Sequence, residues 1–494
     1  MNTIFINQSD KADIVDQAFR SVKWAGLTNL IPRFITPVST MVLAALLTPP
    51  DFGIVAAATV VISLAQIVIE LGVGPAVIQR RELVDEAASI AFWVSLLMAI
   101  LLYGVLWLIA PSIARIYQIP VLSEVIRVSG LSLFLSALIS IPKALLMRQL
   151  EFQRLFWIGA IPLIITALTS VTLALLGGNF WALVIGLLAG QTVNVLLVWR
   201  VSKWKPKLIF RHSIFLSLFS FSFWILVSHF QTWLFLYADS GIAGYFLGAS
   251  MLGVYSLGFN FANLLPGMVS STISTVAYPA FCALQNNRRE VGLDLLKIQT
   301  LASAVIFPVC FGLSAVANPV VSLLYGDRWP NLGLVIQFLV IMPGLSHLWS
   351  LNADGYRAVG RPEMWTKVAG LTLLILIPLL LLAGPYGLIV FVFARFGGAL
   401  LLPLLNITIG SRILSVSVKE QMNSLVVPLG CAIPMHVLVL ALSYLLSPFE
   451  GLVGWMKVSF MIVAGISIYV ALLWRINRGL WQQLLLSTRR VVAF

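Results

Sequence analysis

Long apolar stretches separated by short polar connections fill most of this chain. Fourteen of them lie between residues 25 and 475, and each is close to the roughly 20 residues that a helix needs to cross a bilayer. The pattern predicts an all-α polytopic membrane protein with 14 transmembrane helices. The predicted spans are residues 25–47, 52–74, 88–111, 124–146, 155–177, 180–200, 214–238, 252–281, 297–325, 331–358, 362–384, 386–410, 424–446 and 452–475.

Positive charge alternates from one connection to the next. Lys and Arg are abundant at 201–213, whereas the connections at 178–179 and 384–385 have none. Under the positive-inside rule, this alternation places the basic connections and both termini on the cytoplasmic side. Because an error of one helix would invert the alternation beyond it, the charge pattern also supports the count of 14. The net charge of +13 is spread along one membrane surface and does not indicate a nucleic-acid partner.

The same pattern divides the chain into two groups of six spans and a further pair. Near the start, residues 9–23 place apolar side chains on one face, which predicts either an amphipathic helix on the membrane or a partly ordered tail. The predicted parts are a cytoplasmic N-terminal segment (1–24), an N-lobe (25–200), a basic cytoplasmic linker (201–213), a C-lobe (214–410), two extra C-terminal helices (424–475) and a cytoplasmic tail (476–494).

The two lobes resemble each other in sequence. Residues 52–55 (Phe-Gly-Ile-Val) match 252–255 (Leu-Gly-Val-Tyr), and residues 125–126 (Val-Ile) match 335–336 (Val-Ile). Since each unit has six helices, both enter the membrane in the same orientation, which predicts a parallel repeat. Transporters with such repeats hold substrate in a cleft between the two lobes. A duplicated bundle without a transport role is the alternative.

Motifs for enzymatic chemistry are missing from the sequence. No Gly-Lys dipeptide is present, so the chain has no phosphate-binding P-loop, and it has no His-Glu-X-X-His metal motif. The three cysteines are far apart and show no metal-ligand spacing. We therefore expect no catalytic residue, no bound metal and no cofactor, and movement of a substrate is the remaining class of function.

Two arginines lie inside predicted spans. Arg33 lies between Pro32 and Pro37 in the first span, and Arg395 lies near the middle of the twelfth. An arginine at the centre of a bilayer costs about 2.5–3.5 kcal/mol on insertion scales, so each needs a wet cavity, a partner or an anionic ligand. We predict that both contact a substrate headgroup in a cavity. A structural salt bridge to an acid on a neighbouring helix is the alternative for each.

Five other polar residues are candidates for ion coupling or for lining a cavity. Glu70, Asp239 and Asp354 lie near the ends of spans, where solvated helix ends are the simpler interpretation. Gln231 and Asn260 lie within apolar stretches and either face a wet cavity or hold helices together.

Several short motifs are typical of one membrane-protein family, and together they extend over essentially the whole chain. They are Leu-Gly-Val-Gly-Pro-Ala-Val-Ile-Gln-Arg at 71–80, Ala-Phe-Trp at 91–93, Leu-Gly-Val-Tyr-Ser-Leu-Gly at 252–258, Tyr-Pro-Ala-Phe at 278–281, Leu-Tyr-Gly-Asp-Arg-Trp at 324–329 and Gly-Arg-Pro at 360–362. The chain resembles bacterial polysaccharide flippases, the Wzx-type transporters of the multidrug/oligosaccharidyl-lipid/polysaccharide exporter superfamily. Within these it is similar to the subgroup for colanic acid and succinoglycan export.

The resemblance implies a flippase of the bacterial inner membrane. Its substrate would be an undecaprenyl-pyrophosphate-linked exopolysaccharide repeat unit, carried from the cytoplasmic to the periplasmic face by alternating access. The implied partners are the lipid-linked oligosaccharide, membrane lipids, and the polymerase and chain-length proteins of the same pathway. The alternatives are a drug or small-molecule antiporter of the same superfamily and a lipid II flippase. A polymerase or ligase is disfavoured because the predicted outer loops are short.

Overall fold

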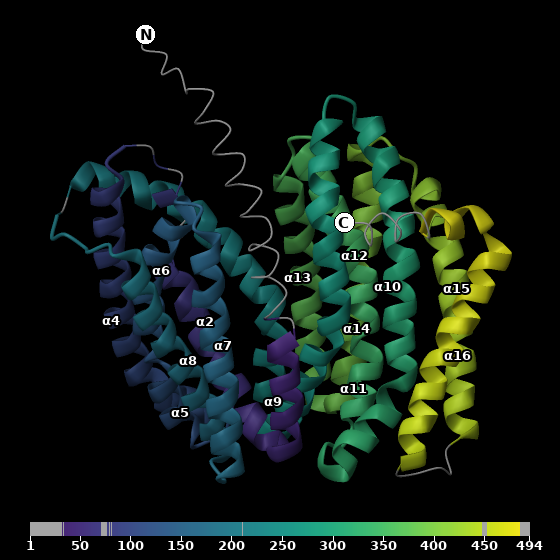
Figure 1. Cartoon of the computed structure of the whole chain (residues 1–494), viewed down its shortest axis with the longest axis horizontal. Helices are drawn as coiled ribbons and strands as arrows, with labels where there is room; N and C mark the ends of the chain where they lie inside the picture. The colour runs from purple at the N-terminus through teal and green to yellow at the C-terminus, as the bar shows by residue number, and fades with distance from the viewer. Residues whose placement is uncertain are drawn as a thin grey trace. The chain divides into compact units, whose positions relative to one another are not determined.

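The computed structural model describes residues 32, 34–70, 77–78, 80, 82–209, 211–446 and 452–484. Within these residues the secondary structure is helical, which confirms the predicted all-α class (Figure 1). Twelve helices of the described part are long and apolar enough to cross a membrane, so the protein is a multi-pass membrane protein. The segment 9–23, where an amphipathic helix is predicted, lies outside the described residues.

The helices follow the predicted spans closely. The first described helix is the apolar segment Phe34–Leu46, which overlaps the first predicted span. The others are α2 (Pro49–Glu70), α4 (Val84–Ile116), α5 (Leu122–Ser129), α6 (Ser132–Arg148), α7 (Phe152–Leu175), α8 (Asn179–Ser202), α9 (His212–Ala283), α10 (Arg288–Tyr325), the 3₁₀ turn η1 (Gly326–Arg328), α11 (Leu332–Leu339), α12 (Ile341–Ala358), α13 (Glu363–Ala383), the 3₁₀ turn η2 (Gly384–Tyr386), α14 (Leu388–Ile413), α15 (Val418–Leu445) and α16 (Leu452–Ile476).

Helix α9 is a helical hairpin, with two arms that meet at Gly248. Gly248 has φ 74° and ψ 179°, a conformation outside the helical region that is open essentially only to glycine. In a continuous helix, residues 239 and 255 would be separated by roughly 24 Å along the axis. Instead, the Tyr255 hydroxyl lies 2.7 Å from Asp239 Oδ2. The chain therefore folds back at Gly248, and the two arms correspond to the predicted spans 214–238 and 252–281. The total of 14 spans stays a prediction.

The internal repeat is visible in the order and length of the helices. Both units contain a long helix followed by a broken one: α5 (Leu122–Ser129) precedes α6, and α11 (Leu332–Leu339) precedes α12 with the same eight-residue length. The packing also repeats, because α4 packs on α5 and α6 as α10 packs on α11 and α12. In the same way α7 packs on α8, and α13 packs on α14. The sequence match between 125–126 and 335–336 lies on these two short helices.

Contacts divide the chain into unit 1 (Met1–Tyr237) and unit 2 (Ala238–Phe494). The division falls inside α9, whereas the sequence places the predicted linker at 201–213. The part of the first α9 arm before residue 238 belongs to unit 1. It contacts α2 there, because Trp233 donates its indole N–H to the Ser63 hydroxyl at 2.9 Å. The predicted lobe boundaries stay a prediction.

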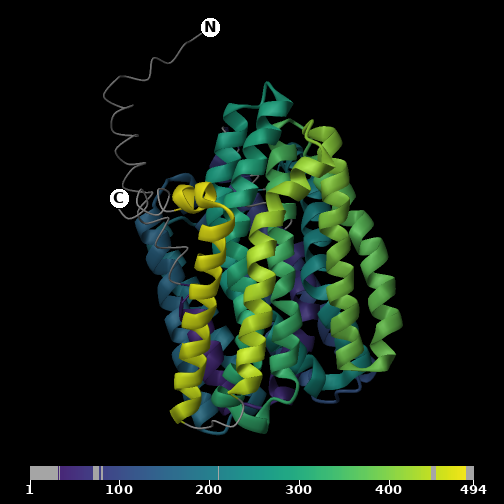
Figure 2. The same cartoon turned by 90° about the vertical axis from the view of Figure 1, so that its right-hand side faces the viewer.

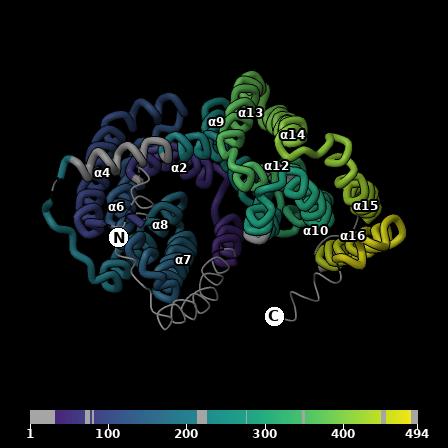
Figure 3. The backbone as a smooth tube through the Cα atoms, turned by 90° about the horizontal axis from the view of Figure 1, so that it is seen from above, coloured from purple at the N-terminus to yellow at the C-terminus, as the bar shows by residue number. Residues whose placement is uncertain are grey.

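The last two helices pack on the repeat within unit 2. Helices α15 and α16 lie side by side, and both contact α10 (Figures 2 and 3). A capping box starts α15: Ser417 Oγ accepts from the Glu420 N–H, and Glu420 accepts from the Ser417 N–H. Glu420 also forms a two-pronged ion pair with Arg289 in the first turn of α10. The start of α15 is thereby tied to the start of α10.

Candidate functional site

A buried ion pair lies inside unit 2. Arg395 of α14 donates from Nε to Asp239 Oδ2 of the first α9 arm at 3.0 Å, and the two residues are only 7% and 2% exposed. The hydroxyl of Tyr255 on the second arm donates to the same oxygen, and the backbone N–H of Ser240 donates to Oδ1. The carboxylate thus accepts three hydrogen bonds, one from a charged donor, which compensates the cost of burying both charges.

This arrangement corresponds to the salt bridge that the sequence left open as the alternative for Arg395. Headgroup contact at Arg395 stays a prediction, and any ligand of Nε would have to replace Asp239. Asp239 was expected at a solvated span end, and its burial corrects that expectation. The reason is that the first α9 arm continues as helix beyond the predicted end at 238, so Asp239 lies within the helix.

The remaining predicted residues are dispersed. Arg33 lies outside the described residues, as does the side chain of Glu70, the last residue of α2. Asp354 of α12 is buried and not a solvated end, and Arg357 one turn further lies 3.3 Å from it. Gln231 is half-buried on the first α9 arm, and Asn260 is exposed on the second arm. Of the predicted residues, the structure brings Arg395 and Asp239 into direct contact.

A second polar cluster, between α12 and α14, was not predicted. Tyr356 is fully buried and its hydroxyl lies 3.2 Å from Asn406 Oδ1, while Asn406 Nδ2 donates to the carbonyl of Leu402. Asn352, one turn before Tyr356, is also buried, and its Oδ1 has no hydrogen-bond partner among the described residues. The sequence signal was the spacing of Asn352 and Tyr356, which places both on one helix face.

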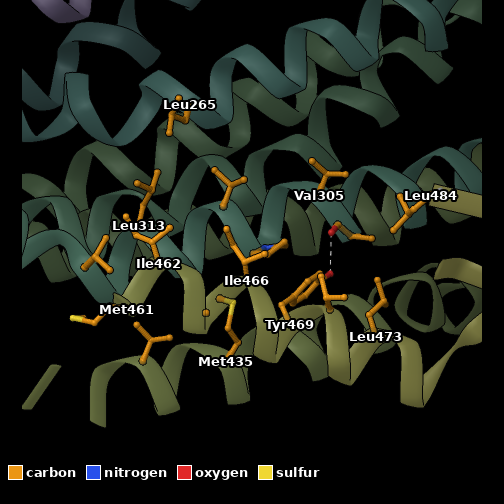
Figure 4. A pocket seen from close by; sticks show the side chains of 18 of the residues that line it. Leu265, Val305, Leu313, Met435, Met461, Ile462, Ile466, Tyr469, Leu473 and Leu484 are labelled. Carbon is orange, nitrogen blue, oxygen red and sulfur yellow. Dashed lines mark hydrogen bonds between the residues drawn. The ribbon is translucent and has the colours of Figure 1, made fainter. Parts of the chain in front are cut away.

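An apolar cavity of about 590 Å³ lies within unit 2, between α10 and the extra helices α15 and α16. Its walls are aliphatic side chains and methionines; examples are Val305, Leu313, Met435, Ile462, Ile466 and Leu473 (Figure 4). One polar group that lines it, the Tyr469 hydroxyl, donates to the Ala304 carbonyl at 2.9 Å. A cavity of this kind accepts hydrocarbon and offers no group for acid–base or nucleophilic chemistry.

Comparison with known sequences supplies the family. Residues 42–332, more than half of the chain, match the family described as polysaccharide biosynthesis protein. The chain belongs to this family. The family contains membrane transport proteins of polysaccharide export, so the resemblance stated from the motifs is confirmed.

Three curated relatives share this similarity. The succinoglycan biosynthesis transport protein ExoT of Rhizobium meliloti is 27% identical over 66% of this chain and 66% of its own length. The lipopolysaccharide biosynthesis protein WzxC of Escherichia coli is 23% identical over 87% of this chain and 88% of its own. The teichuronic acid biosynthesis protein TuaB of Bacillus subtilis is 24% identical over 93% and 96%, respectively.

Solved structures show the same fold. The lipid II flippase MurJ, in an inward closed conformation, has a TM-score of 0.74 with 16% identity, over 93% of this chain and 99% of MurJ. An inward-facing multidrug resistance transporter of the MATE family reaches 0.58 with 13% identity, over 80% of this chain and 99% of its own. At these identities the likeness shows a common fold and carries no information on substrate.

Proposed function

We propose that the protein is a flippase for an undecaprenyl-pyrophosphate-linked exopolysaccharide repeat unit, of the succinoglycan or colanic-acid kind. It moves this lipid from the cytoplasmic to the periplasmic face of the inner membrane. The observation that carries the proposal is the family match over residues 42–332. The names of the relatives ExoT and WzxC support a polysaccharide precursor as the cargo.

The cargo combines a polyprenyl chain with an anionic pyrophosphate and a sugar headgroup, so the protein must handle both chemistries. The apolar cavity between α10, α15 and α16 suits part of the polyprenyl chain. The headgroup needs cationic groups, and Arg33 and Arg395 are our candidates. At Arg395 the Nε donor is occupied by Asp239, so a headgroup contact at this atom involves opening of the ion pair during transport.

Transport in this proposal involves no covalent chemistry. Alternating access moves the headgroup across while the polyprenyl chain stays in lipid, as in other transporters built from repeats. The energy comes from an ion gradient or from removal of the product, with Glu70, Asp239 and Asp354 as coupling candidates and Gln231 and Asn260 as cavity candidates. Both termini lie in the cytoplasm, and the partners are the polymerase and chain-length proteins that consume the flipped lipid.

A deletion strain tests the function directly. Mass spectrometry of its membrane lipids should reveal an accumulated lipid-linked repeat unit, and a plasmid copy of the wild-type chain should clear it. Accumulation of lipid II instead would support the second candidate, a lipid II flippase. A normal lipid profile with a changed drug sensitivity would contradict both and favour an antiporter.

A further inference from the structure

The connection between α8 and α9 is an ordered basic strap. Residues 203–209, here called the lysine strap, lie outside any helix and join the end of α8 to the start of α9 in unit 1 (Figure 1, left edge). No acidic residue occurs between Arg200 and Arg211. Because the strap joins the ends of two membrane-crossing helices, it lies at the membrane surface.

Side chains alternate along the strap. Lys203, Lys205 and Lys207 are exposed, whereas Trp204 and Pro206 between them are partly buried. Trp204 and Pro206 therefore pack toward the protein, while the lysines on either side of them point away from it. The three ammonium groups are thus presented together on the outward face. None of them forms an ion pair with a carboxylate in the part of the chain that the structure describes.

Aromatic packing holds the inner face of the strap. The Trp204 ring lies edge-on to Phe92 of α4, with centroids 5.9 Å apart, and 6.5 Å from the ring of Trp199 on α8. Phe92 is 3% exposed, and the indole N–H of Trp199 donates to the Leu138 carbonyl at 3.1 Å. The strap is therefore fixed on a rigid base and does not hang free as a loop.

Hydrogen bonds hold the backbone of the strap to α4. The Lys207 N–H donates to Ser89 Oγ at 3.1 Å, and the Trp93 indole N–H donates to the Lys207 carbonyl at 3.1 Å. Just beyond the strap, Arg211 pairs with Glu86 at 2.9 Å. The cost of ordering the lysine-bearing backbone is thus met by folding, which favours binding of a ligand to the lysines.

Apolar groups stand next to the lysines. Leu208 is 87% exposed and Trp93 is 37% exposed, both beside Lys207. A row of ammonium groups bordered by an exposed leucine and a tryptophan fits the membrane interface, where phosphates lie above the acyl chains. We propose that the lysine strap is a binding site for anionic phospholipid headgroups, with Leu208 inserted among the acyl chains. The proposal does not depend on the identity of the transported cargo.

Lipid binding to the purified full-length protein tests this site. Phosphatidylglycerol and phosphatidylcholine are titrated into micelles, and native mass spectrometry counts the lipids retained. The test variant is Lys203→Gln/Lys205→Gln/Lys207→Gln. Its control, Lys143→Gln/Lys367→Gln/Lys419→Gln, removes the same charge from exposed lysines elsewhere on the predicted cytoplasmic side. Because the strap variant loses three neighbouring positive charges at the membrane surface, we expect it to lose at least about tenfold in preference for phosphatidylglycerol. The control keeps the wild-type preference.

A third variant separates geometry from charge. Trp93→Phe removes the N–H that donates to the Lys207 carbonyl and leaves the net charge unchanged, so we expect a smaller loss of preference. If the strap variant and its control lost the preference for phosphatidylglycerol equally, binding would depend on net charge alone, and the proposal would be overturned. An unchanged preference in the strap variant would also overturn it. Binding of soluble poly-glutamate without any preference for phosphatidylglycerol would instead identify a protein-binding surface.

Discussion

Arg395 and Asp239 are 156 residues apart in sequence, yet their Nε and Oδ2 atoms lie 3.0 Å apart in the interior of unit 2. Tyr255 donates to the same carboxylate oxygen. The cluster therefore joins α14 to both arms of the α9 hairpin. Two roles are compatible with this geometry: a structural ion pair that holds three segments together, and an ion pair that opens during transport so that Arg395 can contact the headgroup.

Replacement of one or both charges distinguishes these roles. Asp239→Leu alone should destabilise the protein by about 3–5 kcal/mol, because it leaves Arg395 buried and unpaired. Asp239→Leu combined with Arg395→Met should restore thermal stability, because two buried apolar side chains then replace the buried ion pair. Stability is measured as the melting temperature in detergent, alongside the amount of protein in the membrane.

Export by the double variant then reports on the headgroup. If Arg395 contacts the cargo, the stable double variant exports nothing and the lipid-linked repeat unit accumulates. Wild-type export from the double variant would show that the ion pair has a structural role and that Arg395 does not contact the headgroup. A single Arg395→Ala variant cannot separate the two, because it leaves Asp239 buried without its charged partner.

The hydroxyl of Tyr255 gives a milder test of the same cluster. Tyr255→Phe keeps the buried ring and removes one of the three hydrogen bonds to Asp239. Because the acceptor is charged, we expect a loss of about 1.5–3 kcal/mol, seen as a lower melting temperature. Tyr245→Phe is the control, since the Tyr245 side chain is exposed on the first α9 arm. An equal fall in both variants would contradict the assigned role.

Much of the fold was accessible from the sequence because membrane helices are local features. Each predicted span overlaps a described helix, and the sequence match between residues 125–126 and 335–336 lies on the short helices α5 and α11, although the breaks after these two helices were not predicted. The predicted spans place a connection at 239–251, but its exact position at Gly248 was not predicted. Apolar residues continue on both sides of this glycine, so hydropathy does not mark the single residue at which the helix reverses.

The candidate site was less accessible because it depends on contacts between distant segments. Hydropathy identified Arg395 as an unusual charge in a span, and the need for a partner followed from the cost of burial. The sequence did not identify Asp239 as the acid that pairs with Arg395, because the first α9 arm extends past the predicted end at residue 238. The donor Tyr255 gave no separate signal, since a tyrosine in an apolar helix is ordinary in sequence.

The α9 turn predicts a specific sensitivity to substitution. Gly248→Ala should destabilise unit 2 by about 1–3 kcal/mol, because a Cβ is strained at φ 74° and ψ 179°. Steric overlap is not the cause, since a Cβ built at Gly248 meets nothing within 4 Å. Gly267→Ala is a matched control: it has equal open space on the second arm and a helical backbone, so alanine there should be neutral or stabilising. Equal melting temperatures for the two variants would contradict the assignment of strain to Gly248.

If the apolar cavity holds part of the polyprenyl chain, a larger side chain that fills it should block binding of this chain without unfolding the protein. Gly312 lines the cavity, and a Cβ there would approach only Met435, at 3.9 Å, so Gly312→Leu projects into free space. We expect this variant to keep the wild-type melting temperature. In native mass spectrometry it should bind undecaprenyl phosphate at least about tenfold more weakly, which corresponds to about 1.4 kcal/mol. Cells that carry it should accumulate the lipid-linked repeat unit. Gly430→Leu is the control, because Gly430 lies on α15 with nothing within 4 Å of its Cβ position and does not line the cavity. Unchanged lipid binding and export by the Gly312 variant would separate the cavity from the transport path.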